Sequence, residues 1–253
     1  MKPYTIHIMQ YARNEVTTSR AFLGDFHMAP LEMFYYMWAL SNGEHTVVVD
    51  MGFTEAVCRE RERQWVADPA ARLDAVGIDP AQVEHVIITH MHWDHVGNYA
   101  LFPKATFYIQ EDEMAFYTGR YVKYPVFRRS IEVDDVLALV RHSYTGRIGF
   151  CRGSEEIVPG VRVHRVSGHT MGMQIVEVAT ASGTAVLASD ASHYYRNYRE
   201  YLPFTTLHDI PGMLDGFELV RRLAGREELI VPGHDPEVMQ RLPRHSEGVV
   251  VLK

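Results

Sequence analysis

The segment from Thr89 to His95, which reads Thr-His-Met-His-Trp-Asp-His, constrains this chain more than any other feature. It closes the strand-like run 85–90, which is rich in Val and Ile. His90 and His92 are two positions apart, so extended backbone directs both imidazoles to the same side. Imidazole and carboxylate ligands together suit Zn²⁺, Fe²⁺ or Mn²⁺. The segment therefore predicts a metal site at a strand end, with a solvated histidine-rich loop as the alternative.

Three further polar side chains stand in matching contexts, each straight after an apolar run: His169, Asp190 and His234. Polar residues that follow apolar strands gather at one rim of a sheet, and small neighbours let the backbone approach closely there. Taken alone, each is an ordinary turn residue. Their occurrence in this order after the 89–95 segment favours one composite site. The small neighbours are Gly168, Ala188 and Gly233.

Composition narrows the function classes. The chain has 253 residues and a net charge of -7, and an acidic balance disfavours nucleic-acid binding. Only two cysteines are present, so neither a disulfide scaffold nor a cysteine-rich zinc module is expected. The N-terminus lacks a signal-peptide-like apolar core, and no later run approaches the length of a membrane span. We therefore expect a cytoplasmic protein without a membrane or nucleic-acid partner.

Strand-like and helix-like segments are interleaved along the chain. Hairpin turns are expected at Asn42-Gly43 and Ser182-Gly183. The pattern favours an α/β fold with two sheets and helices outside, a four-layer sandwich, although alternation alone also fits a doubly wound sheet. The expected strands are 5–9, 33–40, 45–51, 85–90, 105–110, 161–166, 174–180, 184–189 and 228–233, and the expected helices are 54–63, 68–77, 111–118, 131–143 and 210–224.

The complete motif, His-x-His-x-Asp-His followed by a His, an Asp and a His that each end a strand, resembles the metallo-β-lactamase superfamily. The resemblance extends from residue 47 to residue 235 and implies that residues 1–253 form a single domain with the αββα four-layer sandwich. It implies two divalent ions, with Zn²⁺ expected and Fe, Mn or Co as alternatives. In the family pattern, His90, His92 and His169 bind one ion, Asp94, His95 and His234 bind the other, and Asp190 bridges them. Asp50 matches a family position that supports the turn rather than binding metal.

The resemblance implies hydrolysis by a hydroxide that bridges the two ions, with Asp94 accepting or passing a proton. The bridging Asp190 disfavours β-lactams as substrates. The 19 residues after His234 leave no room for the helical extension of glyoxalase II-like enzymes. Compact members with this ligand set resemble N-acyl-homoserine lactonases, so a small lactone is the expected substrate. The alternatives are a thioesterase, phosphodiesterase or other ester hydrolase on the same metals, an iron-dependent oxidoreductase, and a non-catalytic scaffold.

One position departs from the lactonase pattern. Those enzymes carry a Tyr three residues after the bridging Asp, where this chain has His193, followed by Tyr194. Either side chain is a candidate for contact with the substrate carbonyl. Two segments are candidate pocket walls, the apolar 22–38 and the aromatic 117–130, although both also suit plain core packing. The resemblance further implies a homodimer.

Overall fold

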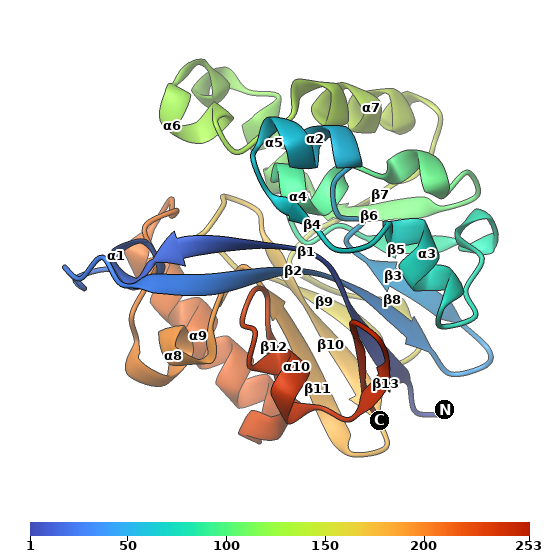
Figure 1. Ribbon diagram of the computed structural model, residues 1–253. Coiled ribbons are helices and arrows are strands. Elements are labelled where there is room, and N and C mark those ends of the chain that lie inside the picture. The colour runs from blue at the N-terminus through green and yellow to red at the C-terminus, as the bar shows by residue number, and fades with distance from the viewer.

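Two β-sheets pack face to face in the computed structural model, which describes residues 1–253 (Figure 1). The larger has nine strands in the order β13-β14-β1-β2-β3-β5-β6-β7, with β4 beside β1, and the smaller has the order β12-β11-β10-β9-β8. The strands are β1 (Thr5–Thr17), β2 (Pro30–Ser41), β3 (Thr46–Val49), β4 (Gln64–Trp65), β5 (His85–Ile87), β6 (Thr106–Gln110), β7 (Ile148–Cys151), β8 (Ser154–Val158), β9 (Val161–Arg165), β10 (Gln174–Thr180), β11 (Gly183–Ser189), β12 (Ile230–Pro232), β13 (Arg244–Ser246) and β14 (Val249–Leu252).

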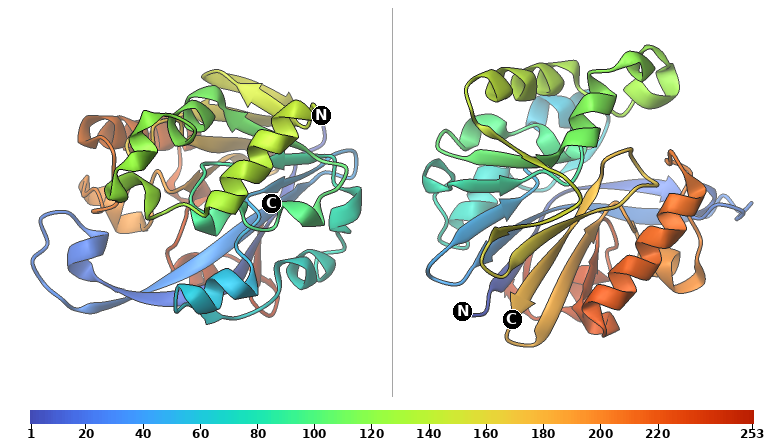
Figure 2. Two further views of the ribbon diagram at one scale, coloured as in Figure 1. Left: turned by 90° about the horizontal axis from the view of Figure 1, so that it is seen from above. Right: turned by 180° about the vertical axis from the view of Figure 1, so that it is seen from behind.

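Helices cover the outer face of each sheet (Figures 1 and 2). Those from α2 to α7 lie on the larger sheet, and α9 lies against β11 of the smaller one. The helices are α1 (Thr18–Ala21), α2 (Glu55–Glu60), α3 (Pro69–Asp74), α4 (Trp93–Val96), α5 (Glu111–Tyr117), α6 (Pro125–Arg128), α7 (Val133–Tyr144), α8 (Tyr195–Glu200), α9 (Ile210–Ala224) and α10 (Val238–Arg241), with short 3₁₀ turns at Pro80–Gln82, Tyr99–Leu101, Arg120–Lys123 and Glu227–Leu229. The expected αββα four-layer sandwich is confirmed.

The alternation of side chains along the strands divides the core into two layers. In β1, Ile6 and Ile8 enter the cluster between the sheets, whereas Met9 joins the cluster beneath the helices. In β2, Trp38 likewise enters the cluster between the sheets, and its neighbours Met37 and Ala39 join the cluster beneath the helices. Successive strand residues point to opposite faces, so a strand covered on both sides must be apolar at almost every position. This explains why residues 33–40 lack a polar face.

The structure differs from the sequence expectation mainly at strand lengths and edges. β1 and β2 form one long hairpin, paired from Thr5 and Ser41 to Thr17 and Pro30, well past their apolar runs. The strands stay paired beyond these runs because backbone hydrogen bonds can continue from a buried section of the hairpin without an alternating apolar pattern. The edge strands β7, β8 and β13, and β14 between β13 and β1, were not expected, since short strands carry little periodicity. The helix expected over 54–63 ends at Glu60, and Glu62 takes a left-handed φ of 55°.

The sheet topology places several strand ends at one rim. β3, β5 and β6 are parallel neighbours, as are β11 and β12. β9 has the direction of β11 because both pair antiparallel with β10. The residues that follow these strands therefore meet at one edge of the sandwich. No helix is long and apolar enough to cross a membrane.

Candidate metal centre

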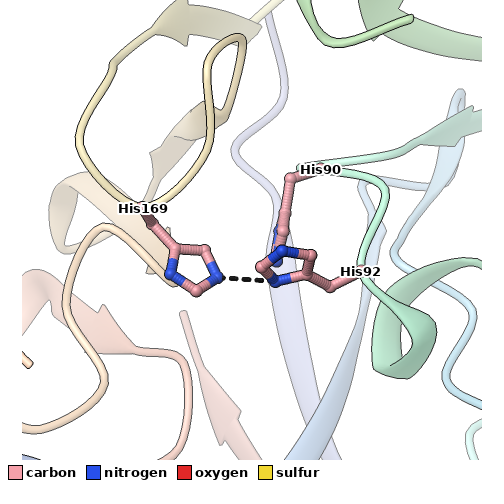
Figure 3. A group of neighbouring side chains, drawn as sticks. All are labelled: His90, His92 and His169. Atoms are coloured by element: carbon pink, nitrogen blue, oxygen red, sulfur yellow. Dashed lines mark hydrogen bonds between the residues drawn. The ribbon is translucent and has the colours of Figure 1, made fainter. Parts of the chain in front are cut away.

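All seven sequence-predicted ligands meet at this rim. His90, His92, Asp94 and His95 come from the loop after β5 and the start of α4, and His169 comes from the loop between β9 and β10. The remaining two follow β11 and β12. Figure 3 shows His169 reaching His90 and His92 from the opposite loop. The seven side chains are buried, and they are His90, His92, Asp94, His95, His169, Asp190 and His234.

Two groups of three possible ligands match the two sets that the family pattern implies. The ligand atoms of His90, His92 and His169 lie within 4.8 Å of one another, and those of the other group, Asp94, His95 and His234, do so as well. In the first group, His169 Nε2 lies 2.8 Å from His92 Nδ1 (Figure 3). The protein thus assembles two neighbouring clusters of nitrogen and oxygen donors.

The carboxylate of Asp190 lies between these clusters, with one oxygen toward each. Oδ1 is 3.0 Å from His234 Nε2 and 3.5 Å from His95 Nε2. Oδ2 is 3.3 Å from His169 Nε2 and 3.9 Å from His90 Nε2. A carboxylate in this position can bind a different cation with each oxygen.

The outer nitrogen of most of these imidazoles is held by the protein. Nδ1 of His169 donates to the carbonyl of Thr206 at 2.7 Å, and Nδ1 of His234 donates to that of Phe34 at 2.7 Å. His92 Nε2 contacts the Tyr117 hydroxyl at 3.0 Å. Such contacts fix the tautomer and direct the other ring nitrogen toward the centre. On that inner side, Nε2 of His90 and Nε2 of His95 are buried without a hydrogen-bond partner.

Local electrostatics fit the binding of cations. Burial lowers the pKa values of His90, His92 and His169, so their imidazoles are neutral, the form that binds metal. Burial also lowers the pKa of His95, but the neighbouring carboxylates have a larger effect and raise this pKa well above its ordinary value. The carboxylates are those of Asp94, Asp50 and Asp190. The carboxylates therefore stabilise positive charge where His95 sits. Unpartnered nitrogens and buried carboxylates together fit a pair of divalent ions better than an empty site, because uncompensated buried polar groups are costly.

Asp50 connects three parts of the centre through hydrogen bonds. It accepts from the backbone N–H of Thr89 at 2.8 Å, from the Thr89 hydroxyl at 2.7 Å and from Nδ1 of His95 at 2.7 Å. Asp50 has a left-handed φ of 55°, and Ser189, which precedes Asp190, has a φ of 45°. Such backbone costs about 1–3 kcal/mol per residue in a non-glycine position and persists where the surroundings enforce it. The supporting role expected for Asp50 agrees with these contacts.

Asp50→Asn should lower metal affinity about 10–100-fold, the usual effect of losing a partner of a ligating histidine. The amide keeps one acceptor oxygen for three converging donors, so His95 loses its fixed orientation. Competition with a chelating dye measures the affinity. Asp68→Asn is the matched control, since Asp68 also accepts backbone N–H groups but caps α3 on the surface. Unchanged affinity in Asp50→Asn would show that His95 is held without it.

A buried glutamate that the sequence reasoning missed joins the two histidine loops. Glu113 of α5 is fully buried and accepts from the backbone N–H of Met91 at 2.9 Å, between His90 and His92. Its other oxygen accepts from the Thr170 hydroxyl at 2.7 Å, next to His169. Burial raises its pKa, although these donors act in the opposite direction. Nothing in the sequence distinguishes it from other acids in a first helical turn.

Two glycines beside the ligands are required by close backbone approach. A Cβ on Gly233 would lie 2.6 Å from the carbonyl oxygen of Ser189, and one on Gly168 would lie 2.5 Å from the backbone of Met213. Gly168 also has a φ of 115°. Gly233 therefore lets the ends of β11 and β12 lie close together, and Gly168 lets the loop that carries His169 pack against α9.

His193 and Tyr194 occupy different surroundings. His193 lines the cavity at the centre, stacks on Phe204 with centroids 3.4 Å apart, and places Nε2 2.8 Å from Asp190 Oδ2. Burial lowers its pKa to about 4, although Asp190 acts in the opposite direction, so the ring is neutral near pH 7. Tyr194 does not line the cavity; it packs against Phe22 and donates to the carbonyl of Glu32. Direct contact of Tyr194 with the substrate, one of the two sequence alternatives, is therefore not supported by its position.

The cavity above the centre has a volume of about 210 Å³. Both candidate walls contribute to it only in part: Met33 and Tyr35 from the 22–38 segment, and Arg129 and Ser130 from the end of the 117–130 segment. Phe26 at the hairpin tip is instead 92% exposed. Most aromatic residues of 117–130 lie outside this cavity. The cavity rim is therefore more polar than the apolar sequence of these segments suggested.

Residues 32–234 match the model of the metallo-beta-lactamase superfamily, and the chain belongs to this superfamily. It is 27% identical over 169 residues to the N-acyl homoserine lactonase AiiA of Bacillus thuringiensis subsp. kurstaki, a match that covers 65% of this chain and 61% of the relative. It is 30% identical over 186 residues to the N-acyl homoserine lactonase AiiB of Agrobacterium fabrum, covering 70% and 66%.

Solved structures match the fold. A crystal structure of a quorum-quenching N-acyl homoserine lactone lactonase superposes with a TM-score of 0.81 at 21% identity, covering 97% of this chain and 98% of that one. The structural match supports the fold over nearly the full length. The sequence matches span only about three fifths to two thirds of the lactonase relatives.

Proposed function

We propose that this protein is a dinuclear metal-dependent hydrolase that opens a lactone ring, of an N-acyl-homoserine lactone or a similar compound. The observation that carries the proposal is the position of Asp190, which directs one carboxylate oxygen toward each of two histidine clusters. Two ions held in this way would acidify a water molecule and polarise the ester carbonyl. Zn²⁺ suits the mixed imidazole and carboxylate donors, and Fe, Mn and Co fit the same set.

The side chains of this chain have distinct roles in the proposal. His90, His92 and His169 would hold one ion, and Asp94, His95 and His234 the other. Burial would raise the pKa of Asp94, but His95 and His234 hold it well below its ordinary value, so Asp94 is an anion, the form that binds a cation. Acceptance or transfer of a proton by Asp94 is part of the proposal and does not follow from this pKa. His193 would donate a hydrogen bond to the substrate carbonyl.

Metal analysis and a substrate panel test this proposal together. Protein purified without chelator should contain close to two equivalents of metal by elemental analysis, because two ligand sets and a bridge are present. The panel compares lactones, thioesters and phosphodiesters at equal concentration, before and after metal removal, and lactones should be hydrolysed fastest. One equivalent or none after metal loading would contradict the dinuclear centre. Preference for thioesters or phosphodiesters would assign the same centre to the alternative hydrolase classes.

Three further expectations from the sequence stay predictions: a single domain over 1–253, a cytoplasmic location and a homodimer. Light scattering at micromolar concentration measures the last of these. A monomer mass would contradict it.

A further inference from the structure

Four arginines line the cavity above the metal centre, although the chain as a whole has a net charge of -7. Arg20 comes from α1, Arg61 and Arg63 from the segment after α2, and Arg129 from the end of α6. Residues far apart in the sequence thus bring guanidinium groups to one opening. Composition does not explain this concentration of positive charge.

Only one of the four has its charge balanced by a carboxylate of the protein. Arg61 pairs with Glu132, whose Oε1 accepts from Nε at 2.7 Å. Arg63 instead donates to the Tyr35 hydroxyl at 3.1 Å and to the carbonyl of Arg61, both neutral groups. The Arg20 and Arg129 side chains make neither an ion pair nor a hydrogen bond with the protein. The cavity's own carboxylates, Asp94 and Asp190, lie among the histidines.

Two of the four arginines lie over the indole ring of Trp93, an aromatic side chain of the cavity. The guanidinium carbon of Arg61 lies 4.6 Å from the Trp93 ring centroid, and that of Arg63 lies 5.5 Å from it. The other large apolar or aromatic side chains of the cavity are Val16, Met33, Tyr35 and Phe204. Within this cavity, an apolar acyl chain on the Trp93 ring would lie beside the half-buried guanidinium groups of Arg61 and Arg63, which is unfavourable. An anionic group would gain charge-assisted hydrogen bonds from them.

We propose that the substrate is a lactone or ester that carries a carboxylate away from its scissile bond, and that Arg63 and Arg129, with Arg20 at the rim, bind this carboxylate. The planar guanidinium matches a carboxylate with two parallel hydrogen bonds. Arg63 is the best positioned of them, because Tyr35 and the Arg61 carbonyl fix its orientation. This inference rests on the proposed function, since the scissile bond is taken to lie at the metal centre.

Matched lactones test the preference. We compare kcat/KM for N-(5-carboxypentanoyl)-homoserine lactone, for its terminal carboxamide and for its terminal phosphonate. The carboxylate compound should exceed the isosteric carboxamide about 10-fold or more, the effect of one charge-assisted hydrogen bond. Arg129→Gln should remove most of the preference for the carboxylate over the carboxamide, and Arg63→Gln should remove a larger part of it. Arg128→Gln is the matched control: it removes the same charge one position away, outside the cavity.

Equal rates for carboxylate and carboxamide in the native enzyme, or an unchanged ratio in Arg129→Gln and Arg63→Gln, would overturn the carboxylate subsite. Preference for the phosphonate would assign the arginines to a phosphate group instead and overturn the choice of carboxylate. Added salt should reduce the ratio, because exposed guanidinium groups are screened.

Binding separates this inference from the proposed function. The γ-lactam analogues of the carboxylate and carboxamide compounds resist ring opening, so calorimetry measures their affinity without turnover. One outcome is that the carboxylate lactam binds more tightly than the carboxamide lactam, that Arg129→Gln abolishes this difference, and that the protein hydrolyses no lactone. This outcome would support the anion subsite and contradict the lactonase activity. Hydrolysis of lactones with equal binding of both lactams would leave the activity standing and overturn the subsite.

Discussion

Asp190→Asn should lose most of its metal and reduce kcat/KM by more than about 100-fold, beyond the effect of removing an outer partner of a ligand. In the native protein the two oxygens of Asp190 face different histidine clusters. A neutral amide offers one oxygen and one N–H group, so it cannot serve both clusters. It also removes the negative charge that offsets repulsion between two cations. Elemental analysis after dialysis and kcat/KM for the best lactone measure the two effects.

The control for this variant is Asp209→Asn. Asp209 caps α9 by accepting from the backbone N–H of Gly212, and Asn caps helices equally well. It should keep full metal content and activity. If Asp190→Asn retains two equivalents of metal and native turnover, Asp190 does not bridge the ions.

His193→Ala should lower kcat about 100-fold, in line with the loss of one donor to a developing oxyanion, while metal content stays unchanged. The neutral imidazole has one N–H, and in the structure Nε2 donates it to Asp190 Oδ2 at 2.8 Å. The prediction therefore requires that Asp190, once it binds the ions, releases this N–H to the substrate. Phe204 stacks on the ring and fixes its plane. His193→Tyr should keep substantial activity because a phenol also donates one hydrogen bond.

Two comparisons make the His193 prediction decisive. Tyr194→Phe should behave like the native enzyme, because its hydroxyl donates to the Glu32 carbonyl away from the cavity. Native turnover in His193→Ala with a loss in Tyr194→Phe would transfer the role to Tyr194. Because His169, Asp190 and His193 also form a group of possible ligands, a fall in metal content in His193→Ala would instead make His193 a ligand.

The metal centre could be predicted from sequence because its ligands come from strand ends. His90 and His92 lie two residues apart in the loop that follows β5, and Asp190 and His234 follow strands that turn out to be parallel neighbours. Polar residues directly after apolar strands usually either form a turn or belong to a functional site. Edge strands such as β7 could not be predicted, because pairing on one side only leaves little periodicity in the sequence.

The sequence by itself determined the seven candidate ligands, because local spacing shows which polar residues follow apolar strands. The division of these ligands into two sets, and the choice of the four-layer sandwich over a doubly wound sheet, rested on the resemblance to the metallo-β-lactamase superfamily. Only the tertiary structure placed Glu113 between the two histidine loops, separated His193 from Tyr194 and gathered the four arginines around the cavity. Those relations join residues tens of positions apart through side-chain packing and hydrogen bonds, and spacing along the chain carries no record of such contacts.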